Sequence, residues 1–96
     1  PAPTPAVLYP EPVPVEVLDS AGRAVGVSAR GLLTGEPARV QAEPIAAWAG
    51  PWPLDERWWD PRGHRRLARF QLLTSSGRAY LATVERQQWW LVAEYG

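Results

Sequence analysis

The sequence contains no cysteine, no lysine, a single histidine and no long apolar run. Without cysteine, the chain has no disulfide framework, no thiolate zinc site and no cysteine nucleophile, which fits a reducing cytoplasm. No apolar stretch approaches the roughly 20 residues that a membrane-spanning helix needs, and the first residues lack the basic-then-apolar order of a signal peptide. Because 96 residues are the size of one domain, we expect a single small domain without a membrane segment.

Neither positive nor negative charge is in excess. Ten arginines balance ten acidic residues, so the formal net charge is zero. Proteins that bind nucleic acids usually carry a basic excess, because neutralisation of phosphates dominates their affinity. The composition therefore counts against strong non-specific binding to nucleic acid, although it leaves room for a local basic patch.

The sequence has no complete set of catalytic groups. His64 stands among arginines, whose charges disfavour its protonation, and no serine lies in a nucleophile-elbow motif. Asp55, Glu56 and Asp60 are close enough in sequence to hold Mg²⁺, but helix capping by Asp60 and ion pairing of the other two with arginines is the better interpretation. The glycines form no phosphate-binding loop. We therefore predict a module that is not an enzyme and holds neither a cofactor nor a metal.

Six prolines stand among the first 14 residues. Proline supplies no N–H and fixes φ. We therefore predict that residues 1–11 form an extended linker without regular structure, and that the domain covers residues 12–96.

Strand signals follow the linker. Apolar residues alternate over residues 13–18 and 25–30, and the loop Ser20-Ala21-Gly22 between them ends in a glycine suited to a left-handed backbone. Residues 38–42 and 44–49 are further strand candidates. The clearest pattern is a three-stranded meander over residues 68–74, 78–85 and 89–95, with turns at residues 75–77 and near residues 86–88. Residues 18–25 resemble residues 73–80, which we interpret as two hairpins with the same turn and not as a duplication.

These signals predict a mainly β fold, a small antiparallel barrel or a strongly twisted sheet, with one or two short helical turns between residues 53 and 67. Residues two apart in a strand point to the same side. For the meander this alternation predicts one shared face, formed by Phe70, Leu72, Tyr80, Ala82, Val84, Trp90 and Val92.

Aromatic residues and arginines lie close together in the middle of the chain. We expect most of the six tryptophans to lie in the core and some to reach the surface. An exposed tryptophan beside arginine is typical of protein-interface hot spots and of single-strand binding surfaces. Because irregular segments on a β scaffold often carry function, we predict that residues 55–69 form the partner-facing site. Its candidate partner-binding residues are Arg57, Trp58, Trp59, Arg62, Arg65, Arg66 and Arg69. At least one of the two adjacent tryptophans should be partly exposed, since neighbours in an extended segment point opposite ways.

The tryptophan spacing carries a family resemblance. Residues 17–23 and 31–34, the segment AWAGPWPLDERWWDP at residues 47–61, the ARFQ stretch at residues 68–71 and the Trp89-Trp90 pair resemble the C-terminal domain of ImuB proteins. The resemblance covers nearly the whole chain after the linker.

The resemblance implies a role. ImuB proteins are similar to Y-family DNA polymerases that have lost catalytic carboxylates, and they act as scaffolds in damage-induced mutagenesis. We therefore expect a protein-interaction module of a translesion-synthesis complex in the cytoplasm, near the nucleoid. Its implied partners are an ImuA-type RecA-like protein, an error-prone C-family polymerase, or both, while the sliding clamp binds a motif upstream of this chain. The alternatives are a module that binds single-stranded DNA or primer-template, and a domain with a purely structural role.

Overall fold

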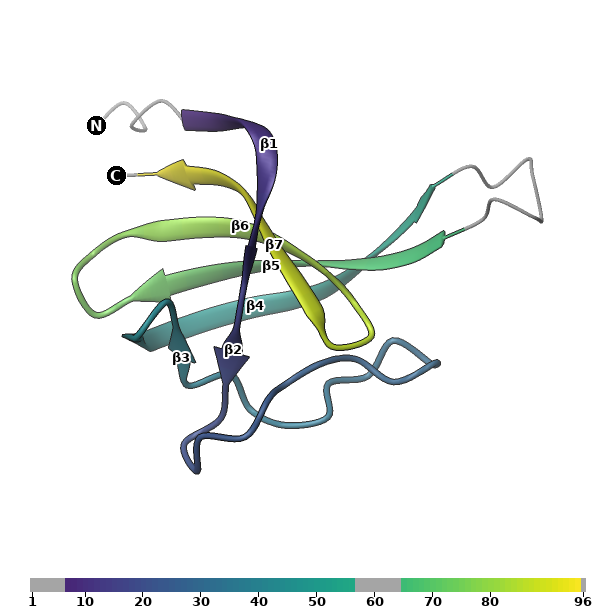
Figure 1. Ribbon diagram of the computed structural model, residues 1–96, viewed down its shortest axis with the longest axis horizontal. Coiled ribbons are helices and arrows are strands. Elements are labelled where there is room, and N and C mark those ends of the chain that lie inside the picture. Colours follow the sequence, from purple (N-terminus) through teal and green to yellow (C-terminus); the bar gives the residue numbers. More distant parts are fainter. Residues whose placement is uncertain (1–6, 57–64, 96) are drawn as a thin grey trace.

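The computed structural model of the protein describes residues 7–56 and 65–95, and for residues 53–56 and 65–66 it gives the course of the backbone alone. The described residues form seven strands, all paired antiparallel in the order β1-β7-β6-β5-β4-β3-β2 (Figure 1). The strands are β1 (Val7–Val15), β2 (Val17–Leu18), β3 (Arg39–Val40), β4 (Glu43–Glu56), β5 (Arg65–Thr74), β6 (Ala79–Glu85) and β7 (Gln88–Tyr95). The prediction of a mainly β antiparallel fold is confirmed.

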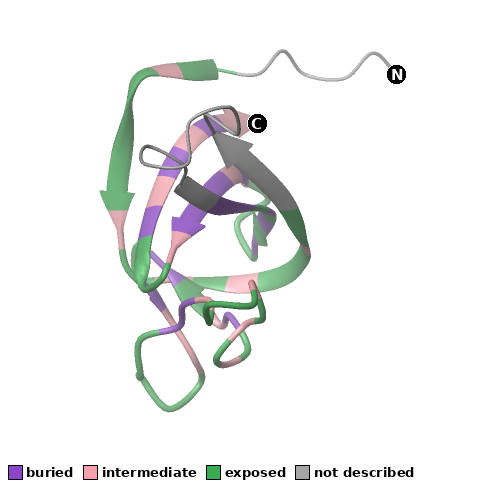
Figure 2. Ribbon diagram, turned by 90° about the vertical axis from the view of Figure 1, so that its right-hand side faces the viewer, coloured by how far each residue is buried: buried purple, intermediate pink, exposed green. Residues whose placement is uncertain are grey.

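The sheet curls into a half-barrel. Its two end strands, β1 and β2, are consecutive in the chain and are separated by Glu16 alone. β1 pairs with β7 and β2 pairs with β3, so one nearly continuous stretch of chain links the two ends of the sheet. Buried residues line the inside of the curl, while β1 is mostly exposed (Figure 2).

The N-terminal segment is more regular than its prolines predicted. β1 begins at Val7, where the pairs Val7–Glu94 and Leu8–Ala93 join it to β7. The expectation that residues 1–11 lack regular structure is therefore wrong for residues 7–11, and residues 1–6 lie outside the described residues. β1 is an end strand, which needs hydrogen bonds on one side only, and such strands tolerate proline. The pairing is also interrupted between Leu8 and Val13, so most of the proline-rich part is not in register with β7.

The predicted helical turns do not occur in the part of residues 53–67 that the structure describes. There, residues 53–56 belong to β4 and residues 65–67 to β5. The pairs Leu54–Leu67 and Glu56–Arg65 continue the ladder toward the tip of this long hairpin. Pairing with β5 across the hairpin outweighs the local helix signal after Pro53. Residues 57–64, with the predicted cap at Asp60, lie outside the described residues.

The predicted strand over residues 25–30 is also absent. Successive hydrogen bonds from this segment reach different parts of the fold: Val25 N donates to Val17 O of β2 at 2.9 Å, and Val27 N donates to Arg86 O of the β6–β7 turn at 2.6 Å. A segment that changes partner after two residues builds no ladder. It forms isolated bridges only, from Ala24 to Leu18 and from Val27 to Leu33.

The loops at residues 20–22 and 75–77 have the predicted glycine geometry. Gly22 and Gly77 have φ values of +81° and +90°. In each loop the glycine N–H donates to the carbonyl of the residue that precedes the loop, Asp19 or Thr74, at 3.0 Å. The two similar sequence stretches therefore make the same turn.

The register of β7 differs from the prediction by one residue. Phe70, Leu72, Tyr80, Ala82 and Val84 are buried as predicted, whereas Trp90 and Val92 are only half-buried. The buried residues of β7 are Trp89, Leu91 and Ala93.

Turn length explains this difference. The β6–β7 loop contains two residues, Arg86 and Gln87, and places Glu85 opposite Gln88 and Val84 opposite Trp89. A loop that also includes Gln88, as predicted, moves every side chain of β7 to the other face.

Trp89 is the centre of the core. Its ring lies 5.1 Å from that of Phe70, centroid to centroid, at a tilt of 47°. Its indole Nε1 donates a 2.7 Å hydrogen bond to the carbonyl of Val25. This bond joins residues 19–38, which lie at one end of the curled sheet, to β7 (Figure 1). This segment contributes Val25 to a core built mainly from the sheet. Among the described residues there is no helix with the length and hydropathy to cross a membrane.

Candidate interaction surface

Arg69 is the one candidate residue whose side chain the structure describes. It is exposed on β5 and stands between Trp52 of β4 and Thr83 of β6. Arg65 and Arg66 lie at the start of the same strand, opposite Glu56 and Asp55, with their backbone alone described. The other four candidates, which are Arg57, Trp58, Trp59 and Arg62, lie outside the described residues.

The tryptophans are less buried than expected. Of the four whose side chains are described, Trp89 alone is fully buried. Trp90 is half-buried, and Trp48 and Trp52 are 36% and 45% exposed. The expectation that most tryptophans lie in the core is therefore wrong for these four. β4 has β3 beside it only at residues 43 and 44, so beyond that point it forms the rim of the half-barrel, where large side chains are not covered.

The outward side of strands β4–β7 carries a mainly apolar surface, which we call the outer face. Cross-strand partners point to the same side of a sheet, so the pairs Ala47–Leu73, Leu73–Ala79 and Ala79–Tyr95 form one row across four strands. The outer face includes Ala47, Ala49, Trp52, Arg69, Gln71, Leu73, Ala79 and Tyr95.

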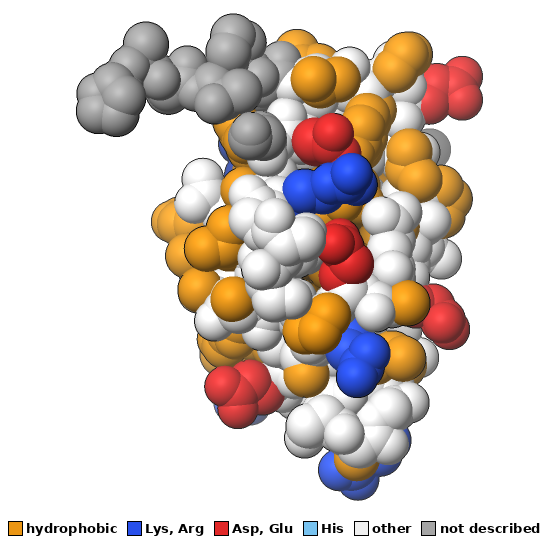
Figure 3. Space-filling view, turned by 90° about the vertical axis from the view of Figure 1, so that its left-hand side faces the viewer, with side chains coloured by type: hydrophobic (Ala, Val, Ile, Leu, Met, Phe, Trp, Pro, Cys, Tyr) orange, Lys and Arg blue, Asp and Glu red, His pale blue; other side chains and the backbone are white. Residues whose placement is uncertain are grey.

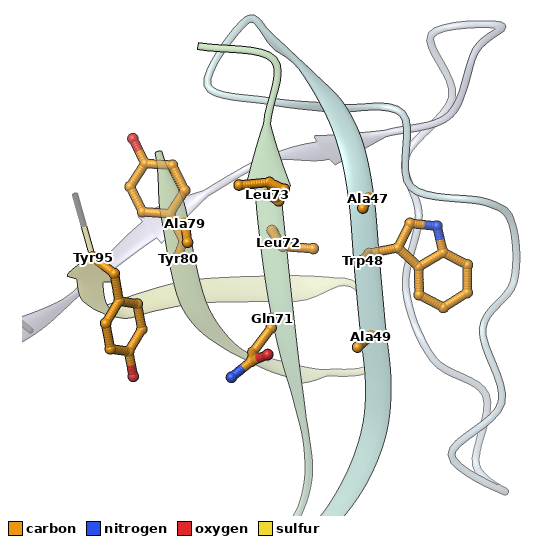
Figure 4. Close-up of a pocket in the computed structure, with 9 residues that line it drawn as sticks. All are labelled: Ala47, Trp48, Ala49, Gln71, Leu72, Leu73, Ala79, Tyr80 and Tyr95. Carbon is orange, nitrogen blue, oxygen red and sulfur yellow. The ribbon is translucent and has the colours of Figure 1, made fainter. Parts of the chain in front are cut away.

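A hollow of about 480 Å³ lies on this face. Figure 4 shows Gln71 and Leu73 on the middle strand, Ala47 and Ala49 on one side and Tyr95 on the other. The alanines make the hollow, because their methyl groups stand beside the larger Leu73 and Tyr95. Leu73 is 41% exposed, which is high for a leucine in the middle of a sheet. Trp48 points away from β5 at the rim (Figure 4), and its ring lies 6.2 Å from that of Phe70.

Charges are unevenly placed around the hollow. Arg69 is a charged residue of the outer face, and it has no ion-pair partner among the side chains that the structure describes. At the other end of the sheet, a hydrogen bond to Tyr80 and the nearby charges of Glu94 and Glu43 raise the pKa of Arg78. Figure 3 shows a basic side chain between two acidic ones on this side of the molecule.

The acids at this end already have partners. Glu94 accepts a 3.0 Å hydrogen bond from the hydroxyl of Tyr9, and Glu43 accepts one of 2.6 Å from Ser76. Burial of the Tyr9 ring, followed by this bond and the charge of Glu94, raises the pKa of Tyr9 to about 12.

Among the described residues no three His, Asp or Glu side chains gather into a possible metal site. His64, Asp60 and the side chains of Asp55 and Glu56, which the sequence analysis weighed for catalysis or metal binding, are not described.

The outer face was not predicted, because the strand pattern of residues 44–49 does not by itself show which side is solvated. The available signal was the stretch Ala46-Ala47-Trp48-Ala49, in which no residue is polar. A strand with one solvated side usually shows polar residues at every second position.

No protein-family model matches the chain, and comparisons with curated proteins and with solved structures give no match either.

Proposed function

We propose that this domain is a non-catalytic protein-interaction module of an ImuB-like translesion-synthesis scaffold, and that it recruits an ImuA-type RecA-like protein, an error-prone C-family polymerase, or both. The observation that carries the proposal is the outer face, where Leu73 and Trp52 are exposed beside a hollow lined by alanines. Contiguous exposed apolar surface on a small domain is typical of a protein-binding site. The choice of partners rests on the family resemblance of the tryptophan-rich segment.

The outer face has the composition of an interface centre. Aromatic residues and arginine are enriched in such centres, and other charged residues are depleted. Trp52 and Arg69 stand opposite each other at one border of the face, and Tyr95 lies at the other. A partner that covers the face removes the exposed apolar area of Leu73 and Trp52 from water, which favours association at about 25 cal/mol per Å² before the costs of binding.

A titration of the whole chain tests the proposal. An ImuA-type protein and a C-family polymerase are added separately, at low and moderate salt, to the wild type and to Leu73→Asp. We expect the variant to bind the true partner at least about tenfold more weakly, because a carboxylate in an apolar contact leaves an unpaired buried charge.

Leu32→Asp is the matched control. Leu32 is 62% exposed in the loop at residues 28–34, outside the outer face. Circular dichroism and thermal unfolding of both variants confirm that they fold. If neither protein binds the wild type, or if Leu73→Asp and Leu32→Asp bind equally well, the proposal is wrong.

Binding of single-stranded DNA is the second candidate, favoured by the exposed pair of Trp52 and Arg69 on adjacent strands. Stacking on an aromatic ring with a neighbouring cation is a common way to hold a single strand. A labelled oligonucleotide in the same titration separates the two functions, because binding to DNA falls steeply with salt, by roughly 0.7 decades per decade of salt for each phosphate contacted. Apolar contact with a protein tolerates salt.

A further inference from the structure

The free edges of the sheet are poor templates for an added strand. β1 carries Pro10, Pro12 and Pro14, and the part of β4 beyond its pairing with β3 carries Pro51 and Pro53. Proline offers no N–H to a neighbouring strand, and natural proteins place it on sheet edges to prevent pairing there. A partner therefore meets side chains on the outer face and does not extend the sheet.

The hollow sets the first requirement on the partner. Its volume of about 480 Å³ exceeds what one side chain fills, and its floor is formed by alanine methyl groups beside Leu73. None of the described residues that line it is charged. It therefore accepts a cluster of apolar side chains and not a chain of phosphates.

Arg69 sets the second requirement. It stands four residues from Leu73 on β5, which at a rise of about 3.3 Å per residue places the two backbone positions about 13 Å apart. Because Arg69 is exposed and has no ion-pair partner among the described side chains, the outer face presents a positive charge beside the hollow. An arginine in this position pairs with a carboxylate in a planar, two-bonded geometry.

We propose that the outer face binds a protein segment that places apolar side chains in the hollow at Leu73 and a carboxylate, about 13 Å away, on Arg69. This inference rests on the proposed function and states the chemistry of the partner at that site. A cation beside a hollow with an apolar lining favours an acidic protein segment over nucleic acid, which needs several phosphate contacts for its affinity.

A displayed library of random peptides, selected on the whole chain, tests this chemistry without assuming any particular complex. We expect enriched peptides to combine an apolar pair with one Asp or Glu at a constant spacing. One enriched peptide is then synthesised, and its affinity is measured for the wild type, Leu73→Asp, Arg69→Gln and Arg69→Glu.

We expect Leu73→Asp to weaken binding at least about tenfold. Arg69→Gln removes an exposed ion pair and weakens binding about two- to fivefold, and Arg69→Glu about tenfold because it adds repulsion. A peptide in which the acid is replaced by lysine should regain affinity for Arg69→Glu. The controls Leu32→Asp and Arg30→Glu lie in one exposed loop away from the face, and they should change the affinity by less than about twofold.

Several outcomes overturn the inference: no enriched peptide, enriched peptides that are basic, equal binding to all Arg69 variants, or an oligonucleotide that competes with the peptide. The titration with the ImuA-type protein and the polymerase is a separate measurement. If it fails while the acidic peptides bind at the outer face, the assignment to a translesion-synthesis complex is wrong and the chemistry of the site stands.

Discussion

Gly26 has the least room for a side chain among the described glycines. A Cβ built on it meets the carbonyl oxygen of Arg86, and it lies 2.8 Å from the Cα of Gln87. Both atoms belong to the backbone of the β6–β7 turn, which also accepts the hydrogen bond from Val27. The contact between residues 19–38 and the sheet therefore requires a residue without a side chain at this position.

Gly26→Ala should lower the free energy of unfolding by about 1–3 kcal/mol, because overpacking against backbone forces the two segments apart. Gly35→Ala is the control, since its nearest neighbour would be a side-chain carbon of Val25 at an ordinary 3.6 Å. Chemical denaturation followed by tryptophan fluorescence measures both. Equal stability of Gly26→Ala and Gly35→Ala would show that the turn at residues 86–87 moves freely.

Tyr9 makes the stability of the folded protein depend on pH in the alkaline range. Its pKa is raised from 10.0 to about 12 in the folded chain. Between these pH values the unfolded chain releases a proton that the folded chain keeps, so the stabilising contribution of Tyr9 is complete below pH 10 and is lost as the pH rises to about 12.

Tyr9→Phe should therefore reduce the fall in stability over this pH range. At neutral pH it should cost about 0.5–1.5 kcal/mol, because the hydrogen bond to Glu94 is lost. Urea denaturation of both proteins at a series of pH values measures the effect. Parallel pH profiles for the two proteins would mean that Tyr9 does not cause the loss of stability at alkaline pH.

At the scale of elements, the β3–β4 hairpin has an unfavourable turn. Gln41 and Ala42 connect the pair Val40–Glu43, and both have positive φ, 49° and 64°. A two-residue hairpin turn with both φ values positive strongly prefers Asn-Gly. Residues with a Cβ lose about 1–2 kcal/mol in this conformation.

Replacing Gln41 by Asn and Ala42 by Gly should raise the free energy of unfolding by about 1–2 kcal/mol. Ala29→Gly is the control: Ala29 lies in an exposed turn and is not among the residues with positive φ. Glycine there should lower stability, since it adds freedom to the unfolded chain. Thermal unfolding compares the stability of the variants. If Ala29→Gly is also more stable than the wild type, the positive φ values at residues 41 and 42 do not explain the stabilisation.

The elements differ in how well the sequence predicts them. The meander and the loops at residues 20–22 and 75–77 were predictable because alternation and glycine placement are local signals. The register of β7 was not, because it depends on whether Gln88 belongs to the turn or to the strand. The start of β1 was missed because proline excludes a central strand but not an end strand, and chain position does not reveal which strand lies at an end.

At the scale of the whole molecule, the candidate site was the least predictable part. The sequence analysis placed it at residues 55–69, and Arg69 is the residue that both that prediction and the outer face contain. The outer face combines residues from four strands, among them Ala47, Leu73, Ala79 and Tyr95, whose proximity follows from the pairing and from no local motif.

The stability of the domain should depend on β1. Removal of residues 1–11 deletes the pairs of Val7 and Leu8 with β7 and the hydrogen bond from Tyr9 to Glu94, and it exposes part of β7 near Ala93. We expect a loss of about 1–3 kcal/mol in the free energy of unfolding, from hydrogen bonds and apolar burial together.

Removal of residues 1–6 alone is the matched control, because it leaves every contact described for β1 in place. Thermal unfolding of the two truncated chains measures the difference. If both are as stable as the whole chain, residues 7–11 act as a linker despite their pairing with β7.

The pairing of β1 with β7 also governs when the domain can form during synthesis. Val7 is made first among the described residues and pairs with Glu94, one of the last. Strands β4 to β6 are consecutive hairpins and can pair as they leave the ribosome, whereas β1 must wait for β7. Pairing between distant parts of a chain is slow and costs loop entropy. The nascent protein therefore carries the proline-rich strand β1 unpaired until β7 has been made, and those prolines keep the waiting strand from pairing with other chains.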